Sequence, residues 1–350
     1  QALRHLPWVG ITGTNGKTTV THLLSHVLEC AGLHAPMGGN MGVSAAEMAL
    51  QLKQASGPEP DWMVMELSSY QIEATPDLAP RIGLWTTLTP DHLERHGTLD
   101  AYRAIKRGLL ERSELAIFNA DDPDLRQQRD SWQQRGIWVS AAGHRPDGQD
   151  ADLWIDEDDQ VRGPDGPLFP ATALAMPGLH NRQNLLMVTA AARRIGLPAA
   201  EIEAALRRFP GVPHRLELLG TVNGLSVFND SKATNYDAAE VGLRAMTAPV
   251  VVLAGGETKR GEAAGWLEQM KRKACAVVLF GAGAEELHTL IDASGFPGVL
   301  HRCSDLPEAV PLALAEGCRL KAASLLLSPA CASFDPVSYT HLTLPTTGVV

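Results

Sequence analysis

The chain has 350 residues, of which 45% are hydrophobic and 20% charged, so it is long enough for about two globular domains. Its formal net charge of -10 argues against a nucleic-acid partner, which would favour a basic face. No stretch approaches the roughly 20 apolar residues of a membrane span, so no membrane insertion is expected. The five cysteines form no C-x-x-C pair, which argues against a disulfide framework or a zinc site and favours a reducing cytoplasm.

The first half of the chain alternates short apolar runs with helical patterns. Residues 7–12 predict a buried strand that leads through a glycine-rich turn into a helix over residues 17–31, with Gly32 as its stop. Further strands are predicted at residues 62–67, 82–88 and 115–119, and a further helix at residues 99–112. Short apolar runs separated by helices predict a parallel, doubly wound sheet.

The sequence changes character after these elements. Residues 143–170 are rich in Asp, Gly and Pro and predict a small excursion of β-hairpins, before helical patterns return at residues 181–195 and 199–209. The Pro-Gly-Val-Pro segment at residues 210–213 is the best candidate for a domain boundary. We therefore expect a P-loop ATPase-type α/β domain with a parallel sheet over residues 1–211.

The second half repeats the alternation of strands and helices. An antiparallel strand pair is predicted at residues 215–222 and 225–229, turning at Asn223-Gly224. Strands then follow at residues 250–253, 276–280, 299–301 and 324–327, with helices beginning near residues 238, 263, 284 and 306. This pattern predicts a Rossmann-like α/β domain over residues 212–335. Residues 336–350 show no clear period, and we interpret them as an unrelated or misread tail.

A candidate phosphate loop lies between the first predicted strand and helix, where residues 12–19 read TGTNGKTT. Its glycines let the backbone turn N–H groups inward as an anion nest, and the following helix adds its positive end. Lys17 would reach the β- and γ-phosphates, and the Thr18 or Thr19 hydroxyl would help to hold Mg²⁺. Ile11 stands where the general G-x-x-x-x-G-K-(S/T) pattern has its first Gly, and the alternative is a turn with a solvated lysine. The residues predicted to bind ATP here are Gly13, Thr14, Asn15, Gly16, Lys17, Thr18 and Thr19.

Four further side chains, Glu66, His92, His96 and Lys106, are candidates for metal ligands near the phosphates. Glu66 ends a predicted strand, and ligands gather at the carboxyl ends of strands in open α/β sheets; the alternative is a solvated glutamate. His92 and His96 have a spacing compatible with zinc on a helix, but no third ligand follows at the usual distance, so a magnesium near phosphates suits His92 better. For Lys106, the pattern alone favours a solvated helix face.

Several of these motifs resemble those of one family, the Mur ligases. The phosphate loop, residues 66–71 (ELSSYQ) and residues 91–96 (DHLERH) are similar to the ATPase domain of that family. Blocks similar to its D-glutamate-adding branch are PGLHN at 177–181 with Asn184, PHRLE at 213–217, NDSKATN at 229–235 and SPACAS at 328–333. Together these blocks extend from residue 8 to about residue 335.

The resemblance implies roles for individual residues. Lys106 would carry a carbamate formed with CO₂, which exchanges a cation for oxygen ligands to a hard metal. The implied catalytic residues are Lys17, His92, Lys106 and Lys232. The implied ligands of Mg²⁺, at two sites, are Thr18, Glu66, His92 and Lys106. The adenine and ribose of ATP would be bound by Asn181, Asn184, Arg215 and Asp230. The other substrates would be bound by Asn40, Ser68, Lys232, Thr234, Lys259 and Ser333.

The implied activity is ATP-dependent amide ligation in peptidoglycan precursor synthesis. The carboxylate of UDP-N-acetylmuramoyl-L-alanine would be activated as an acyl phosphate and captured by the amine of D-glutamate. The enzyme would act as a monomer in the bacterial cytoplasm. Two alternatives remain open: a sister ligase that adds another amino acid or extends a folate glutamate tail, and an ATP-binding module that does not ligate. The block at residues 229–235 argues against the sister ligase.

The chain departs from the family pattern in three places. It begins at the strand before the phosphate loop, so the family's N-terminal UDP-binding domain is expected to be missing. Residues 336–350 do not resemble the family's final segment, which contributes to the D-glutamate pocket. Glu257-Thr258 precedes Lys259 where relatives tend to have Asp-Gly, which weakens the assignment of Lys259.

Overall fold

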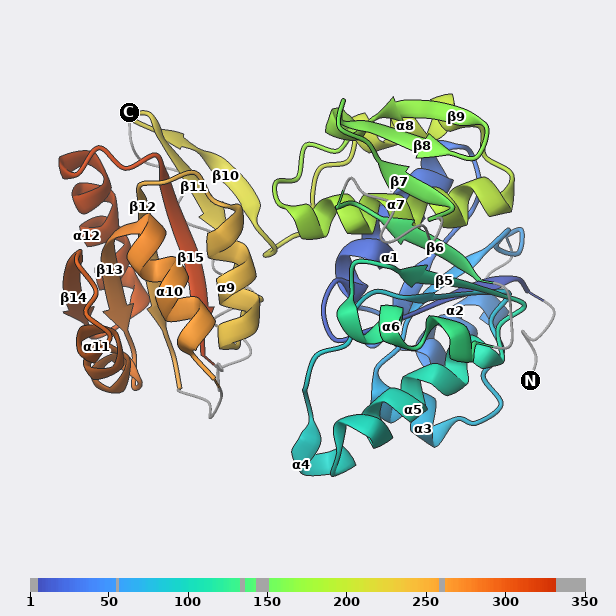
Figure 1. Cartoon of the computed structure of the whole chain (residues 1–350), viewed down its shortest axis with the longest axis horizontal. Helices are drawn as coiled ribbons and strands as arrows, with labels where there is room; N and C mark the ends of the chain where they lie inside the picture. Colours follow the sequence, from blue (N-terminus) through green and yellow to red (C-terminus); the bar gives the residue numbers. More distant parts are fainter. Residues whose placement is uncertain (1–5, 55–56, 133–135, 143–150, 258–261, 332–350) are drawn as a thin grey trace. The chain divides into compact units, whose positions relative to one another are not determined.

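A computed structural model describes residues 6–54, 57–132, 136–142, 151–257 and 262–331. The chain divides into two compact units, Gln1–Pro210 and Gly211–Val350 (Figure 1). Each unit has its own sheet and its own core, and each is described by itself. Among the described residues, no helix combines the length and the apolar composition needed to cross a bilayer.

The first unit is built on a nine-stranded sheet with the order β2-β3-β1-β4-β5-β6-β7-β8-β9. Neighbouring strands from β2 to β7 pair in parallel, and β7, β8 and β9 pair antiparallel. The parallel sheet and the hairpin excursion predicted from the sequence are thereby confirmed. The strands are β1 (Trp8–Thr12), β2 (Met37–Gly39), β3 (Met63–Glu66), β4 (Ile82–Trp85), β5 (Leu115–Asn119), β6 (Ile137–Ser140), β7 (Leu153–Ile155), β8 (Gln160–Gly163) and β9 (Gly166–Pro170).

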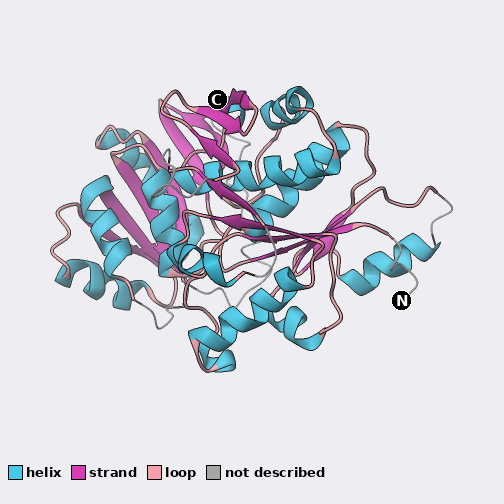
Figure 2. Ribbon diagram, turned by 45° about the vertical axis from the view of Figure 1, so that its right-hand side comes forward, coloured by secondary structure: helices cyan, strands magenta, loops and turns pink. Residues whose placement is uncertain are grey.

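Helices cover both faces of this sheet (Figure 2). Strand residues alternate between two clusters: Ile11 and Leu84 pack with α1, α7 and α8, whereas Trp85 and Phe118 pack with α3, α5 and α6. The helices are α1 (Lys17–Cys30), α2 (Ala45–Gln54), α3 (Ser69–Ala74), α4 (Leu93–His96), α5 (Leu99–Glu111), α6 (Pro123–Gln127), α7 (Leu179–Ile195) and α8 (Ala199–Arg207). Short 3₁₀ turns lie at Arg129–Ser131 and Ala171–Ala173.

The second unit has a six-stranded sheet with the order β10-β11-β15-β12-β13-β14. Strands β10 and β11 form the antiparallel pair expected around Asn223-Gly224, and the other neighbours are parallel. The last strand, β15, lies between β11 and β12 at the centre, a position that its sequence does not indicate. The strands are β10 (Glu217–Val222), β11 (Leu225–Asn229), β12 (Val250–Gly255), β13 (Ala274–Phe280), β14 (Val299–Cys303) and β15 (Ser324–Ala330).

Alternate residues of these strands again face two cores. Val250 and Val252 pack with one set of helices, and Val251 and Leu253 pack with a single helix on the opposite face, α12. Helices on both faces of a mainly parallel sheet agree with the Rossmann-like α/β domain that the sequence predicts for the second half. The helices are α9 (Tyr236–Ala245), α10 (Ala264–Lys273), α11 (Ala284–Ala293) and α12 (Leu306–Arg319), of which α9 to α11 share the first face.

Candidate active site

The phosphate loop joins β1 to α1, as the sequence predicts. Gly16 stands before the first residue of α1 in a left-handed conformation, with φ 85°. The Lys17 ammonium folds back over the loop and donates hydrogen bonds to the carbonyl oxygens of Gly13 (3.0 Å) and Thr14 (2.9 Å). The Lys17 side chain is therefore held at the loop. The alternative of a lysine that extends into solvent is wrong.

Two N–H groups of this loop are not available for the expected anion nest. The Thr14 N–H donates to the carbonyl of Thr87 (2.8 Å) and the Asn15 N–H to the Thr87 hydroxyl (2.9 Å). These two groups therefore point to the segment after β4 and not into a nest. The Gly16 N–H has no acceptor among the described residues, and it lies at the positive end of α1. The Gly16 N–H thus remains available to an anion, which a helix N-terminus favours.

Glu66 ends β3 and is buried, with 2% of its surface exposed, so the alternative of a solvated glutamate is wrong. Its Oε1 accepts a hydrogen bond from the Asn40 side-chain amide (3.0 Å), and the Asn40 N–H donates to its backbone carbonyl (2.8 Å). Its Oε2 is buried without a hydrogen-bond partner in the described structure. A buried carboxylate oxygen needs a partner, and a hard cation such as Mg²⁺ fits this oxygen. Gly39 permits this contact, because a Cβ there would lie 2.2 Å from the Glu66 carbonyl oxygen.

Lys106 is 1% exposed, so the solvated helix face favoured by the pattern is also wrong. Its ammonium donates to the carbonyl of Gly13 (2.9 Å) and lies 3.3 Å from the Thr12 hydroxyl. The Tyr102 ring covers it at 4.5 Å. In the described part of the chain, no carboxylate forms an ion pair with it. Burial, aided by the nearby Lys17 ammonium, lowers the pKa of Lys106 well below its ordinary value.

The two histidines of the predicted metal motif have separate surroundings. His92 is half-exposed, adopts a left-handed conformation (φ 53°) before α4, and lies 3.6 Å from the Asp91 carboxylate and 3.7 Å from that of Glu94. His96 Nε2 lies 2.9 Å from the Ser69 hydroxyl, and burial lowers its pKa. No hydrogen bond or ion pair joins His92 to Glu66 or Lys106 among the described contacts. No group of three or more His, Cys, Asp or Glu side chains suited to a metal occurs in the described segments.

Asn181 and Asn184 lie buried in the first two turns of α7. The Asn181 amide donates to the carbonyl of Pro177 (2.7 Å), and the Asn184 amide to the Asn181 side-chain oxygen (3.2 Å). Asn184 also faces the phosphate loop, because a Cβ added to Gly16 would lie 2.9 Å from its Oδ1. Beside Asn181 is a cavity of about 270 Å³, lined by residues 171, 172, 174–178, 181, 182 and 185.

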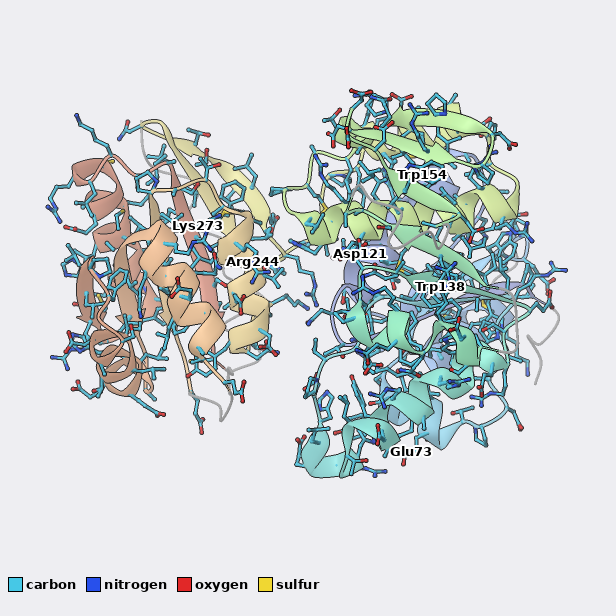
Figure 3. The ribbon with its side chains drawn as sticks, viewed as in Figure 1. Glu73, Asp121, Trp138, Trp154, Arg244 and Lys273 are labelled. Carbon is cyan, nitrogen blue, oxygen red and sulfur yellow. The ribbon has the colours of Figure 1, made fainter. Side chains whose placement is uncertain are left out.

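The carboxylate of Asp121, labelled in Figure 3, anchors the start of α7. It accepts hydrogen bonds from the Ser140 hydroxyl (2.6 Å), the Ala141 N–H (2.8 Å) and the Gln183 amide (3.1 Å). These bonds tie the carboxyl ends of β5 and β6 to the helix that carries Asn181 and Asn184. Ser68, predicted to bind substrate, caps α3 in a reciprocal capping box with Gln71.

In the second unit, the predicted residues follow β11. Asp230 is buried and accepts hydrogen bonds from the Leu216 N–H (3.2 Å) and the Ser328 hydroxyl (3.2 Å). Burial raises the pKa of Asp230 to about 7, against the opposing effect of Arg215. The Lys232 side chain is exposed, and the Thr234 N–H donates to the Lys232 carbonyl (3.1 Å).

Residues 229–235 can also be interpreted without a ligand, as a strand-to-helix turn in which Asp and Ser serve as caps. The cap of α9 is Asn235, whose side chain accepts the Ala238 N–H (2.8 Å), and Asp230 is buried elsewhere. Lys259 and Ser333, which were predicted to bind substrate, lie outside the described residues. The same holds for Thr258 and for residues 336–350, the segment interpreted as an unrelated or misread tail.

Two family models match the sequence over most of its length. The Mur ligase middle domain matches residues 11–192, and the "Mur ligase, glutamate ligase domain" matches residues 214–331. The chain belongs to the Mur ligase family. The two matched segments correspond to the two compact units of this family member.

Relatives in this family share much of the sequence. The UDP-N-acetylmuramoylalanine–D-glutamate ligase of Synechococcus sp. strain CC9605 is 70% identical over 334 residues, which are 95% of this chain and 72% of the relative. The enzyme of the same name from Synechococcus elongatus strain ATCC 33912 is 46% identical, with 96% and 73% covered.

Solved structures of more distant members share the fold. MurF from Acinetobacter baumannii superposes with a TM-score of 0.69 at 18% identity, covering 97% of this chain and 76% of that one. Folylpolyglutamate synthase from Mycobacterium tuberculosis gives a TM-score of 0.69 at 15% identity, covering 94% and 89%. The α/β architecture of this Mur ligase is therefore the one found in these solved structures.

The buried Asp230 predicts a pH dependence of stability. Its pKa is raised from 3.8 in the free side chain to about 7 in the fold, so the unfolded state loses its proton first as the pH rises. Stability is therefore expected to fall with rising pH between these two values. The substitution D230N removes this titration while keeping a hydrogen-bond acceptor. The difference in Tm between D230N and wild type should shift in favour of D230N from about pH 5 to about pH 8. A difference that stays constant over this range would contradict the prediction.

Proposed function

We propose that this chain is an ATP-dependent ligase that joins D-glutamate to UDP-N-acetylmuramoyl-L-alanine. The observation that carries the proposal is the 70% identity over 334 residues with a relative bearing that name. The geometry agrees, because the phosphate loop, the unpaired Glu66 oxygen and the buried Lys106 lie at the carboxyl ends of β1, β3 and their neighbours. We further propose that it acts as a monomer in the bacterial cytoplasm, where its free cysteines would stay reduced.

The proposed reaction has two steps. A carboxylate oxygen of UDP-N-acetylmuramoyl-L-alanine attacks the γ-phosphorus of ATP, and the bond to the bridging oxygen of ADP breaks. The amine of D-glutamate then attacks the acyl carbon, loses a proton, and displaces phosphate from the tetrahedral intermediate. Phosphoryl activation is needed because a carboxylate and an ammonium do not condense favourably in water.

The first unit would supply the charge stabilisation for the first step. The Lys17 ammonium and the N–H groups from Gly16 onward would bind the phosphates of ATP, and Lys17 would neutralise charge that develops on the γ-phosphoryl group. Magnesium would be held at two sites by Thr18, Glu66, His92 and Lys106, and when bound it supplies further neutralisation of the phosphate oxygens.

Carbamylation of Lys106 would remove a buried positive charge that no described carboxylate neutralises. An ammonium that is 1% exposed and has no described carboxylate partner is costly to bury. The lowered pKa of Lys106 shifts its side chain toward the neutral amine, which is the form that adds to CO₂. The carbamate would then present oxygen ligands to a metal shared with Glu66.

The remaining residues would bind substrates. We assign the adenine and ribose to Asn181, Asn184, Arg215 and Asp230, and the cavity beside Asn181 has room for an aromatic base. We assign the D-glutamate carboxylates to Lys232 and Lys259, which are cationic, with Thr234 and Ser333 as hydrogen-bond donors. Asn40 would contact the acyl substrate or the phosphates, with Ser68 at the neighbouring helix start.

Isotope transfer tests the proposed reaction type. The carboxylate of UDP-N-acetylmuramoyl-L-alanine is labelled with ¹⁸O and supplied with Mg·ATP and D-glutamate. The complete gene product is assayed beside these 350 residues, of which the matched 334 span 72% of the relative's length. The mechanism predicts that one labelled oxygen appears in each phosphate released, because the attacking oxygen leaves with the phosphoryl group. Unlabelled phosphate would exclude an acyl phosphate.

A further inference from the structure

The segment after β4 holds a threonine against both glycines of the phosphate loop. A Cβ added to Gly13, whose φ is 147°, would lie 1.9 Å from the Thr86 hydroxyl oxygen. A Cβ added to Gly16 would lie 3.4 Å from the Cβ of Thr86. Thr86 itself is 2% exposed. Its side chain therefore fills the space that the two glycines leave open inside the loop.

The Thr86 hydroxyl links the two ends of this loop. It donates to the carbonyl of Asn15 (2.5 Å) and also lies 3.2 Å from the carbonyl of Thr12. Thr12 is the last residue of β1, and Asn15 immediately precedes Gly16. One buried hydroxyl thus fixes the distance between the strand end and the residue before the anion-binding N–H groups.

The neighbours of Thr86 reinforce the same contact. Thr87 accepts the N–H groups of Thr14 and Asn15, and the N–H of Thr89 donates to the Thr14 hydroxyl (3.0 Å). The segment is anchored behind by the Asn119 amide, which donates to the Thr86 carbonyl (3.0 Å). The phosphate loop is therefore fixed by hydrogen bonds to the segment after β4, in addition to those within its own turn.

We propose that Thr86 is a positioning residue of the nucleotide site: its hydroxyl holds the phosphate loop in the shape that presents Gly16 and Lys17 to the phosphates of ATP. The inference rests on the proposed binding of ATP. Without the hydroxyl, the carbonyl of Asn15 loses the shorter of its two side-chain hydrogen bonds and keeps only the Thr87 hydroxyl at 3.3 Å, so the loop can relax away from the binding shape. Because Thr86 is 2% exposed, it would act through the loop and not by contact with the nucleotide.

Two substitutions separate the hydroxyl from the shape of the side chain. T86V keeps the shape and removes the hydroxyl, and T86S keeps the hydroxyl and removes a methyl group. Affinity for Mg·ATP is measured by titration calorimetry, together with the Tm of each variant. T86V should bind Mg·ATP about tenfold more weakly or worse, because the carbonyl of Asn15 loses its shorter hydrogen bond. T86S should remain within about threefold of wild type, as expected if the hydroxyl is what matters.

A matched control comes from Thr189, a buried threonine of α7 whose hydroxyl donates to the Leu185 carbonyl (2.8 Å). T189V removes a buried hydroxyl of the same unit and should leave the affinity for Mg·ATP unchanged. If T86V does not fold, T87V replaces it, since it removes the acceptor of the Asn15 N–H and should weaken binding in the same sense.

The outcomes separate this inference from the proposed function. Wild-type protein that does not bind Mg·ATP would overturn the proposed function and this inference with it. Wild-type binding that is matched by T86V and T87V would overturn the inference alone. Equal weakening by T86V and T86S would also overturn it, because the effect would then follow packing and not the hydroxyl.

Discussion

Replacing Lys106 by methionine is expected to abolish ligation while leaving the fold intact. Methionine fills a similar volume and places no charge in a site that is 1% exposed, so stability should be unchanged or higher. Activity should fall by on the order of a thousandfold, because the transition state loses charge stabilisation at the γ-phosphoryl group. The measurement is kcat for ADP release beside the Tm. K53M, on the exposed face of α2, is the matched control and should behave as wild type.

Removal of CO₂ adds a test of the carbamate itself. Wild-type activity should decline in buffer stripped of CO₂ and return with added bicarbonate, whereas K106M should respond to neither. Activity of K106M above about a tenth of wild type would show that Lys106 does not hold a group needed for phosphoryl transfer.

The substitution G13A should eliminate nucleotide binding. Its new Cβ would lie 1.9 Å from the Thr86 hydroxyl oxygen and 3.0 Å from the Thr87 nitrogen, so the loop or the segment after β4 must move. The backbone also carries a φ of 147°, which side chains rarely adopt. We expect a loss of unfolding free energy of about 3 kcal/mol or more and no measurable binding of Mg·ATP.

Gly32 provides the control for backbone strain alone. It has a φ of 84°, and nothing lies within 4 Å of an added Cβ. G32A should therefore cost about 1–2 kcal/mol of stability and leave the affinity for Mg·ATP unchanged. If G13A binds Mg·ATP as G32A does, the phosphate loop is not shaped by its contact with Thr86.

Local sequence patterns located most elements of this fold. The strand, loop and helix around Lys17 are where the pattern places them, and the apolar run that ends at Glu66 marks a strand end in the parallel sheet. Strand β2 was missed because it is three residues long and contains two glycines. The central place of β15 was also missed, since strand order depends on contacts between distant segments.

The spacing of apolar residues around Lys106 indicates that this lysine is buried, although the exposed helix face was predicted. On α5 the buried residues are Tyr102, Lys106, Leu109 and Leu110, which recur at the spacing of one helical face. A lysine inside that apolar stripe predicts a buried amine, and buried lysines shift their pKa readily. Thr86 had no comparable signal, because its hydroxyl contacts Asn15 across 71 residues of sequence.

The amino-acid dependence of ADP release tests the central claim most directly. The complete gene product is given Mg·ATP and UDP-N-acetylmuramoyl-L-alanine, and then D-glutamate, L-glutamate, L-alanine or diaminopimelate singly. We predict that ADP release requires D-glutamate and that none of the other three amino acids replaces it. Release with another amino acid, or with none of the four, would contradict the proposed ligation of D-glutamate.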